Sequence, residues 1–277
     1  MAFLAAALQM TSGPDRAANE RRALALVEAA ASRGARLVGL PEVWEHIGPA
    51  AQKHAFAGPL EGRQLAPLRE LAAKRALWLL AGSISEKADE GRTYNTSALI
   101  APDGSLAARY RKIHLFDVDI PDGARYRESE SVAPGAELPP VVPLEGLGIK
   151  LGLAICYDVR FPELFRKLAD AQADMFALPA AFTAFTGKAH WEVLLRARAI
   201  ENQAFAFAPA QVGRIGPAEE NRVAFGHALI ADPWGTVLAD AGPDGEGMAL
   251  AEIDPSRLAQ IRRDLPALRH RRPDILR

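Results

Sequence analysis

Cys156 is the only cysteine among the 277 residues of this chain, and it directly follows the apolar run Leu-Gly-Leu-Ala-Ile (151–155). A single cysteine can form neither an internal disulfide nor a thiolate metal cluster. It is therefore a buried apolar side chain, the common role of free cysteine, or a nucleophile. A nucleophilic cysteine requires a group that takes its proton and donors that stabilise the oxyanion formed on the attacked carbonyl.

Two further ionisable residues occupy similar positions. Glu42 follows a short apolar run that ends in Leu-Pro, and Lys112 follows the second arm of an expected hairpin. Because ligands of layered α/β proteins gather at the carboxyl ends of strands, Glu42, Lys112 and Cys156 are expected to converge on one pocket. Considered singly, Glu42 is consistent with a solvated loop and Lys112 with a solvated basic surface. His114 offers a competing design, a cysteine–histidine dyad, and spacing alone does not decide between the two.

The elements that must position these residues follow an α/β pattern, in which short apolar runs alternate with longer amphipathic segments. Hairpin signals such as Pro-Asp-Gly (102–104) occur beside strand–helix–strand units, which favours a layered α/β sandwich over a purely parallel sheet. No linker-like segment interrupts the pattern, so one domain is expected. Strands are predicted at 3–10, 36–40, 77–82, 97–101, 107–111, 149–156, 174–178, 204–210, 226–231, 236–239 and 248–253. Helices are predicted at 16–33, 63–75, 162–171 and 188–202 and after Pro255, with a loop-rich stretch at 116–147.

The composition excludes several classes of partner. Basic residues number 33 and acidic residues 34, so the formal net charge is −1 and bulk charge attracts neither nucleic acid nor an anionic membrane. No apolar run approaches the roughly 18 residues of a spanning helix. The first ten residues lack the basic start of a signal peptide. We therefore expect a cytoplasmic protein with no nucleic-acid or membrane partner.

The segments around Glu42, Lys112 and Cys156 belong to a series of motifs that extends along nearly the whole chain. The series consists of Leu-Pro-Glu (40–42), Arg-Lys-Ile-His-Leu-Phe-Asp (111–117), Tyr-Arg-Glu-Ser (126–129), Ile-Cys-Tyr-Asp-Val-Arg-Phe-Pro-Glu (155–163), Arg-Ala-Arg-Ala-Ile-Glu-Asn (196–202), Asp-Pro-Trp-Gly (232–235) and His-Arg-Arg-Pro-Asp (270–274). In content and order it resembles the motifs of the nitrilase superfamily of carbon–nitrogen hydrolases, whose members use a Glu–Lys–Cys triad. The resemblance implies a four-layer α-β-β-α sandwich. It also implies one carbon–nitrogen hydrolase domain over 1–277, with a C-terminal arm at about 264–277.

By this resemblance, Cys156 is the nucleophile, Glu42 the general base and Lys112 the partner of the oxyanion. Glu128 matches a second glutamate that the family keeps near the lysine and the substrate. The backbone N–H of Tyr157 would be the second oxyanion donor. The implied reaction passes through a cysteine thioester with release of ammonia or an amine, and it requires no metal and no cofactor.

The segment 179–203 resembles the branch of the family that contains ω-amidase and deaminated glutathione amidase. The run 189–198 and the tail 270–274 are more similar to the latter, which favours that activity over an ω-amidase acting on α-ketoglutaramate or another amidase of the superfamily. The predicted substrate is a small molecule, the ω-amide of a dicarboxylate, whose free carboxylate requires a cation or a helix N-terminus. Arg160 and Lys188 are candidates, although a salt bridge within the protein explains each more readily.

Assembly is a further implication of the resemblance. In the family, the helix that corresponds to 188–202 lies at a two-fold interface, which implies a homodimer with eight layers, α-β-β-α-α-β-β-α. The family often has an aromatic residue after the Pro-Asp pair of the tail, whereas this chain has Ile-Leu-Arg (275–277), so the docking of the arm stays open. Two interpretations from other classes also stay open: a cysteine–histidine peptidase or acyltransferase that uses His114, and a non-catalytic scaffold.

Overall fold

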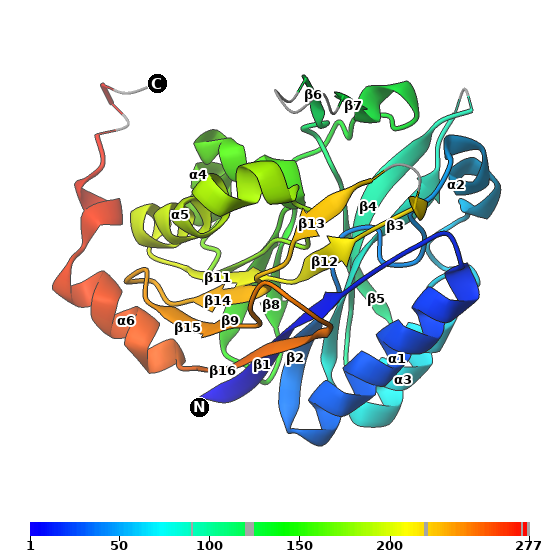
Figure 1. Ribbon diagram of the computed structural model, residues 1–277. Coiled ribbons are helices and arrows are strands. Elements are labelled where there is room, and N and C mark those ends of the chain that lie inside the picture. The colour runs from blue at the N-terminus through cyan, green and yellow to red at the C-terminus, as the bar shows by residue number, and fades with distance from the viewer. Residues whose placement is uncertain (90, 120–124, 219–220, 273, 276–277) are drawn as a thin grey trace.

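The computed structural model describes residues 1–89, 91–119, 125–218, 221–272 and 274–275. Two β-sheets face each other, and helices cover both outer faces (Figure 1). The eight-stranded sheet contains β1 (Phe3–Met10), β2 (Ala35–Gly39), β3 (Trp78–Lys87), β4 (Thr93–Ile100), β5 (Leu106–Arg111), β12 (Ala210–Arg214), β13 (Val223–Phe225) and β16 (Gly247–Ile253). The six-stranded sheet contains β8 (Val141–Leu144), β9 (Ile149–Leu153), β10 (Met175–Ala177), β11 (Phe205–Ala208), β14 (Leu229–Ala231) and β15 (Val237–Asp240).

The strand order shows why chemistry can gather at one edge of the two sheets. The larger sheet has the order β13-β12-β1-β2-β3-β4-β5, with β16 antiparallel to β1, and the smaller has the order β15-β14-β11-β10-β9-β8. Strands β1, β2 and β3 are parallel to one another, as are β9, β10 and β11. The segments that follow β2 and β9 therefore begin at the carboxyl ends of parallel strands, where ligands of α/β sheets bind.

Side-chain alternation along β1 illustrates how the layers form. Ala5 and Ala7 belong to the core between the two sheets, whereas Ala6 and Leu8 belong to the core beneath the helices of the larger sheet. Because successive strand residues point to opposite faces, a strand buried on both faces is apolar along most of its length, as β1 is apart from the buried Gln9. The covering helices are α1 (Arg16–Ser32) and α3 (Ala66–Arg75).

The outer face of the smaller sheet carries α4 (Pro162–Asp170) and α5 (Ala184–Asn202). Phe165 of α4 packs edge-on against Phe176 of β10, with ring centroids 5.1 Å apart, and Trp191 of α5 is fully buried. Helices, sheet, sheet and helices thus form four layers, which confirms the predicted α-β-β-α sandwich.

Several predicted boundaries were wrong for local reasons. The expected strand 204–210 is two strands in different sheets, β11 and β12, separated by Pro209, which has no N–H for a sheet ladder. The expected helix 188–202 begins at residue 184, because the Thr183 hydroxyl caps it by accepting the Thr186 N–H. The expected strand 226–231 begins only at Leu229, after two residues with positive φ.

The stretch expected to be loop-rich, 116–147, contains strands β6 (Asp117–Asp119) and β7 (Arg125–Arg127), which pair with each other, and β8. Sequence patterns also missed α2 (Ala50–Phe56), which has no side-chain cap. A last helix, α6 (Pro255–Asp264), starts at the predicted proline.

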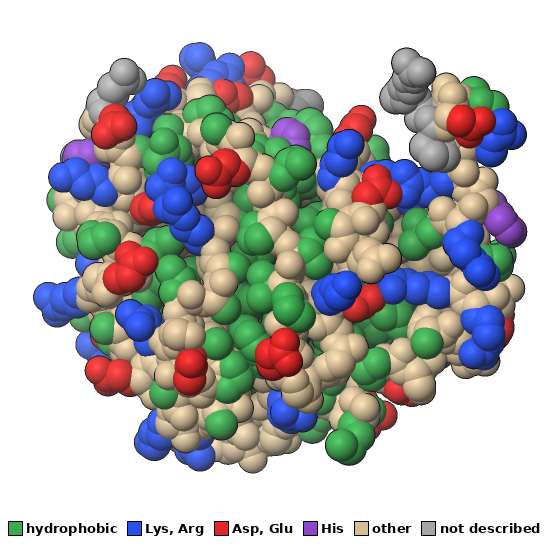
Figure 2. Space-filling model, turned by 180° about the vertical axis from the view of Figure 1, so that it is seen from behind, with side chains coloured by type: hydrophobic (Ala, Val, Ile, Leu, Met, Phe, Trp, Pro, Cys, Tyr) green, Lys and Arg blue, Asp and Glu red, His purple; other side chains and the backbone are tan. Residues whose placement is uncertain are grey.

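The predicted arm begins at the end of α6 and leaves the layers, visible as the projecting C-terminal segment in Figures 1 and 2. Arg271 pairs there with Asp170 at the end of α4. Residues 273, 276 and 277 of the predicted arm lie outside the described residues. In the described ranges, no helix combines the length and apolar character needed to cross a membrane. On the face drawn in Figure 2, acidic and basic side chains are interspersed.

Candidate active site

Five of the predicted site residues, Glu42, Lys112, Glu128, Cys156 and Tyr157, line one cavity of about 710 Å³. Glu42 lies three residues beyond β2, Lys112 directly follows β5, Cys156 lies three residues beyond β9, and Glu128 directly follows β7. Strand ends from both sheets therefore deliver these side chains to one place, although they are far apart in the sequence.

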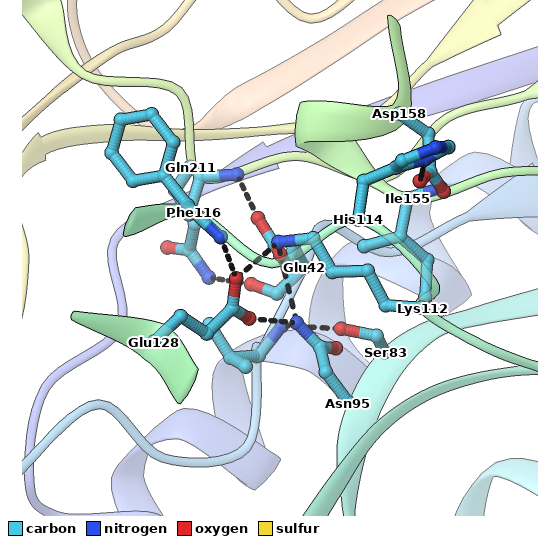
Figure 3. A network of polar contacts seen from close by, with 12 residues as sticks. Glu42, Ser83, Asn95, Lys112, His114, Phe116, Glu128, Ile155, Asp158 and Gln211 are labelled. Carbon is cyan, nitrogen blue, oxygen red and sulfur yellow. Dashed lines mark hydrogen bonds and ion pairs between the residues drawn. The ribbon is translucent and has the colours of Figure 1, made fainter. Parts of the chain in front are cut away.

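Lys112 is the centre of a buried ion-pair network, drawn in Figure 3. Its Nζ is 3.0 Å from Glu42 Oε1 and 2.9 Å from Glu128 Oε2, and its side chain is only 2% exposed. Asn95 of β4 joins the two carboxylates, because its Nδ2 donates to Glu42 Oε1 at 2.9 Å and to Glu128 Oε1 at 3.1 Å. Lysine has three N–H donors, so two are used by the carboxylates and the third is available to a ligand.

Backbone N–H groups also hold both carboxylates. The N–H of Ala181 donates to Glu42 Oε2 at 2.8 Å, and the N–H of Phe116 donates to Glu128 Oε2 at 2.8 Å. Gln211 holds the main chain at Glu42, since its Nε2 donates to the Glu42 carbonyl at 3.0 Å. Both carboxylates are thus fixed before any substrate arrives, which is the preorganisation that an electrostatic catalyst needs.

Cys156 lies at a strained point of the backbone. Its φ is 44°, a left-handed value that costs a residue other than glycine about 1–3 kcal/mol. Its N–H donates to the Pro179 carbonyl at 3.0 Å, and the residue opens a short 3₁₀ turn, Cys156–Arg160. The thiol and the Glu42 carboxylate line the same cavity. The next N–H, that of Tyr157, has no acceptor among the described residues and is available to an oxyanion.

Asp158 connects this cysteine turn to the segment that carries Lys112. Its Oδ2 accepts the Ile155 N–H at 2.8 Å and the Tyr110 hydroxyl at 2.9 Å. The Tyr110 oxygen in turn accepts the Ile113 N–H at 3.3 Å. Because Asp158 is fully buried, the distance between the two segments is set by hydrogen bonds that water does not weaken.

The charges of the site perturb one another. Burial favours a neutral Lys112, but the negative charges of Glu128 and Glu42 raise the pKa of this lysine well above its usual range. Burial also favours a neutral Glu128, yet Lys112 and the Phe116 N–H hold the pKa of that carboxyl below its usual value. Burial, and then the charge of Glu42, raise the pKa of the Cys156 thiol. At neutral pH the site therefore holds an ammonium ion, the Glu128 carboxylate and a neutral thiol.

Three other residues singled out in the sequence do not join this cavity. The His114 ring is held by Asp158, with Nδ1 2.7 Å from Oδ1, and stacks on Phe161, so it does not line the cavity with Cys156. Arg160 contacts His190 Nδ1 at 3.1 Å, and Lys188 is exposed on α5. Neither Arg160 nor Lys188 lines the cavity. Neither forms an ion pair with a described residue, so the prediction that each forms a salt bridge within the protein was wrong.

The family model for carbon-nitrogen hydrolases matches residues 4–263. The chain belongs to this family. A carbon-nitrogen hydrolase from Synechocystis named deaminated glutathione amidase is 48% identical over 271 residues, covering 97% of this chain and 98% of that protein. The human protein named omega-amidase NIT2 is 37% identical over 276 residues, covering 99% and 96% of the two chains. The crystal structure of Saccharomyces cerevisiae Nit3, a member of branch 10 of the nitrilase superfamily, superposes with a TM-score of 0.86 at 31% identity, covering 98% of this chain and 97% of that one.

Membership of the carbon-nitrogen hydrolases makes the protein an amidase, a hydrolase of carbon–nitrogen bonds other than peptide bonds. Among the lining residues that had not been found from the sequence are Asn95 inside β4 and Lys53 on α2. The only signal for Asn95 was an amide within an otherwise strand-like run, and Lys53 had none. In the described part of the chain, no three His, Cys, Asp or Glu side chains are grouped so that they could hold a metal ion.

Proposed function

We propose that this carbon-nitrogen hydrolase cleaves the ω-amide of a dicarboxylate monoamide, with Cys156 as nucleophile, Glu42 as general base and Lys112 as oxyanion partner. The observation that supports this most directly is that the Cys156 thiol lines the same cavity as the ion pair between Glu42 and Lys112, whose atoms are 3.0 Å apart. A nucleophile, a proton acceptor and an electrostatic donor in one cavity are what acyl transfer through a thioester requires.

In the first half-reaction, the Cys156 sulfur attacks the amide carbonyl carbon while its proton passes to the Glu42 carboxylate. The carbonyl oxygen becomes an oxyanion, which the third N–H of Lys112 and the Tyr157 N–H stabilise. When the tetrahedral intermediate collapses, the carbon–nitrogen bond breaks and Glu42 gives its proton to the leaving nitrogen. The products are ammonia or an amine and a thioester on Cys156.

In the second half-reaction, Glu42 removes a proton from a water molecule, which attacks the thioester carbonyl. The same two donors stabilise the second oxyanion. The carbon–sulfur bond then breaks, the sulfur recovers its proton from Glu42, and the carboxylic acid product leaves. Glu128 keeps Lys112 in position through both steps. Its carboxylate accepts a hydrogen bond from the Lys112 Nζ and takes no part in the proton transfers of Glu42.

For the substrate, we propose deaminated glutathione, because the Synechocystis relative that bears this activity in its name is 48% identical over nearly the full length. Hydrolysis of α-ketoglutaramate is the second candidate, since the human ω-amidase is 37% identical over a similar length. Both substrates present a carboxylate at the far end of the acyl group from the scissile amide.

An ammonia- and amine-release assay tests both levels of this proposal. The purified protein is given deaminated glutathione, α-ketoglutaramate, 3-ureidopropionate and a simple nitrile, each with Cys156→Ala as control. We expect the highest kcat/KM with deaminated glutathione and no turnover above background for the Cys156→Ala variant. Turnover by that variant at the parent rate refutes the nucleophile. Preference for the nitrile or the ureido acid refutes the substrate class and leaves the nucleophile in place.

We further propose a cytoplasmic homodimer built from one hydrolase domain over 1–277, with the arm at about 264–277 reaching the partner subunit. Three large apolar side chains on α5 support the interface, because Phe185, Val193 and Ile200 recur at helical spacing and are 50%, 64% and 49% exposed. Light scattering tests this directly. We expect twice the monomer mass for the parent and the monomer mass for Val193→Asp, while an unchanged mass for that variant refutes the proposed face.

A further inference from the structure

Five cationic side chains line the active-site cavity, and four of them are already engaged with another side chain. Lys112 is paired with Glu42 and Glu128, as described above. Arg127 donates to both oxygens of Asp119 at 2.8 Å, and Arg125 lies 3.8 Å from the same carboxylate. Arg222 lies over the ring of Tyr126 at 5.9 Å. Lys53 alone among these lining cations has a side chain that forms no hydrogen bond, ion pair or ring contact with a described residue.

We propose that Lys53 binds the free carboxylate of the substrate's acyl group and so selects dicarboxylate monoamides over uncharged amides. This inference rests on the proposed function, since it concerns the same cavity, and it deepens that function by naming the residue that recognises the substrate class. It replaces Arg160 and Lys188, the two cations suggested by the sequence, neither of which lines the cavity.

The backbone at Lys53 is fixed well enough for such a role. Its N–H donates to the Pro49 carbonyl and its carbonyl accepts the Ala57 N–H, both at 3.1 Å. At the end of the same helix, the Phe56 ring packs edge-on against His46, with centroids 4.9 Å apart. An exposed lysine at the end of a short helix would serve only to interact with the helix dipole. Lys53 is instead half-buried, and its side chain forms part of the cavity wall.

The electrostatics of Lys53 also favour an incoming anion. Burial lowers the pKa of this lysine, and the positive charges of Lys112 and Arg222 act in the same direction. Glu128 and Glu42 oppose that effect from a distance, but both are engaged with Lys112. A substrate carboxylate would supply the directly bonded partner that the Lys53 side chain lacks among the described residues, and the partly desolvated surroundings would strengthen the pairing.

The lining of the cavity offers a group for each part of the substrate. The scissile amide is taken by Cys156, with its oxygen toward Lys112 and the Tyr157 N–H. Apolar side chains that include Val43, Ile47 and Phe182 line the same cavity and suit the methylene groups of an acyl chain. The unpaired ammonium group of Lys53 on the cavity wall can then bind the carboxylate at the other end of that acyl chain.

The test compares two amides that differ only in this charge, glutaramate and pentanamide, with the parent protein, Lys53→Met, Lys53→Arg and Lys74→Met. Lys53→Met keeps the apolar stem and removes the charge. Lys74→Met is the matched control, because Lys74 is exposed on α3, away from the cavity. A lost charge-assisted hydrogen bond lowers kcat/KM by about 10- to 100-fold. With glutaramate as substrate, we expect this loss for Lys53→Met, mainly as an increase in KM. We expect partial recovery of kcat/KM for Lys53→Arg.

Pentanamide turnover separates recognition from folding. We expect Lys53→Met to hydrolyse pentanamide at the parent rate or faster, and Lys74→Met to match the parent with both amides. Equal losses with the two amides in Lys53→Met, or an unchanged preference for glutaramate, overturn the inference while the amidase reaction stands. A parent protein that hydrolyses neither amide overturns the proposed function, and the inference with it.

Discussion

Asn95→Asp is the most informative single change to the charge network around Lys112. In the parent protein, Asn95 Nδ2 donates to Glu42 Oε1 at 2.9 Å and to Glu128 Oε1 at 3.1 Å. The Asn95 Oδ1 has no partner among the described residues, so the amide serves this site as a donor only. The substitution keeps the shape of the side chain and places an oxygen where the donor was.

The distances give the size of the effect. Two full negative charges 2.9 Å apart repel by about 6 kcal/mol at an effective dielectric constant of 20. The introduced carboxyl therefore retains a proton at neutral pH, and its single O–H can donate to only one of the two glutamates. At least one charge-assisted hydrogen bond is lost, which is worth about 1.5–3 kcal/mol. If that bond positions Glu42 in the transition state, kcat/KM falls by about 10- to 150-fold.

The dependence on pH distinguishes this reasoning from general damage to the site. The assay is ammonia release between pH 5.5 and 9, with Asn95→Ala as the matched control that removes both hydrogen bonds without adding a charge. As pH rises, the introduced carboxyl loses its proton and repels Glu42 and Glu128, so the deficit of Asn95→Asp should grow. The deficit of Asn95→Ala should stay constant. Parallel deficits for the two variants across this range would refute the donor role assigned to Asn95.

Three further changes address stability and the geometry behind the site. Gly82→Ala should lower the free energy of unfolding in urea by at least about 2 kcal/mol, because Gly82 has φ +55° and an added Cβ would lie 2.0 Å from the Pro41 carbonyl oxygen. Burial raises the pKa of Glu45 from 4.5 to about 7, so this residue stabilises the fold below pH 4.5 and loses that contribution as pH rises to 7. Glu45→Gln should remove about 3 kcal/mol of this pH dependence from urea titrations. Asp158→Asn replaces one acceptor oxygen by an NH2 donor, so at least one of the groups that contact the carboxylate, the Ile155 N–H, the Tyr110 hydroxyl or His114 Nδ1, faces a donor instead of an acceptor; the change should lower both kcat/KM and the unfolding free energy, the latter by about 1–3 kcal/mol.

Each of these expectations has a result that contradicts it. A Gly82→Ala protein with parental stability would mean that the main chain before Glu42 can move away without cost. A parental pH profile of stability in Glu45→Gln would assign the titration to other groups. Full activity in Asp158→Asn, with only stability reduced, would show that the cysteine turn keeps its position without the link to Lys112.

The residues that could be found from the sequence share one property, a place just after a predicted strand. Glu42, Lys112 and Cys156 all occupy such places, and parallel strands necessarily bring their carboxyl ends to the same edge of a sheet. The family resemblance then added Glu128, which follows a three-residue strand with no strong pattern of its own. The layered fold was predictable for the same reason, since the alternation of strands and helices restricts how layers can form.

The remaining site residues depend on contacts that no local pattern encodes. Asn95 lies inside β4, where one polar residue in a strand usually indicates a solvent-facing position, but the loops carrying Glu42 and Glu128 cover it. Lys53 lies on a seven-residue helix without a side-chain cap, too short for a periodic signal. Lys188 was chosen from its place in a motif, yet it lies on the exposed side of α5. Whether a side chain faces a cavity is set by tertiary packing, and the sequence near these residues does not report it.

The charge balance of the site bears on how the cysteine is activated. A thiolate on Cys156 would add a second negative charge beside Glu42, with Lys112 already shared by Glu42 and Glu128. The raised pKa of the thiol follows from this crowding and from burial, so a stable thiolate is disfavoured before the substrate binds. Activation must therefore coincide with attack, when the proton moves to Glu42 and the negative charge moves to the carbonyl oxygen. The charge then lies against the free N–H of Lys112, so the lysine stabilises the transition state more than the resting enzyme.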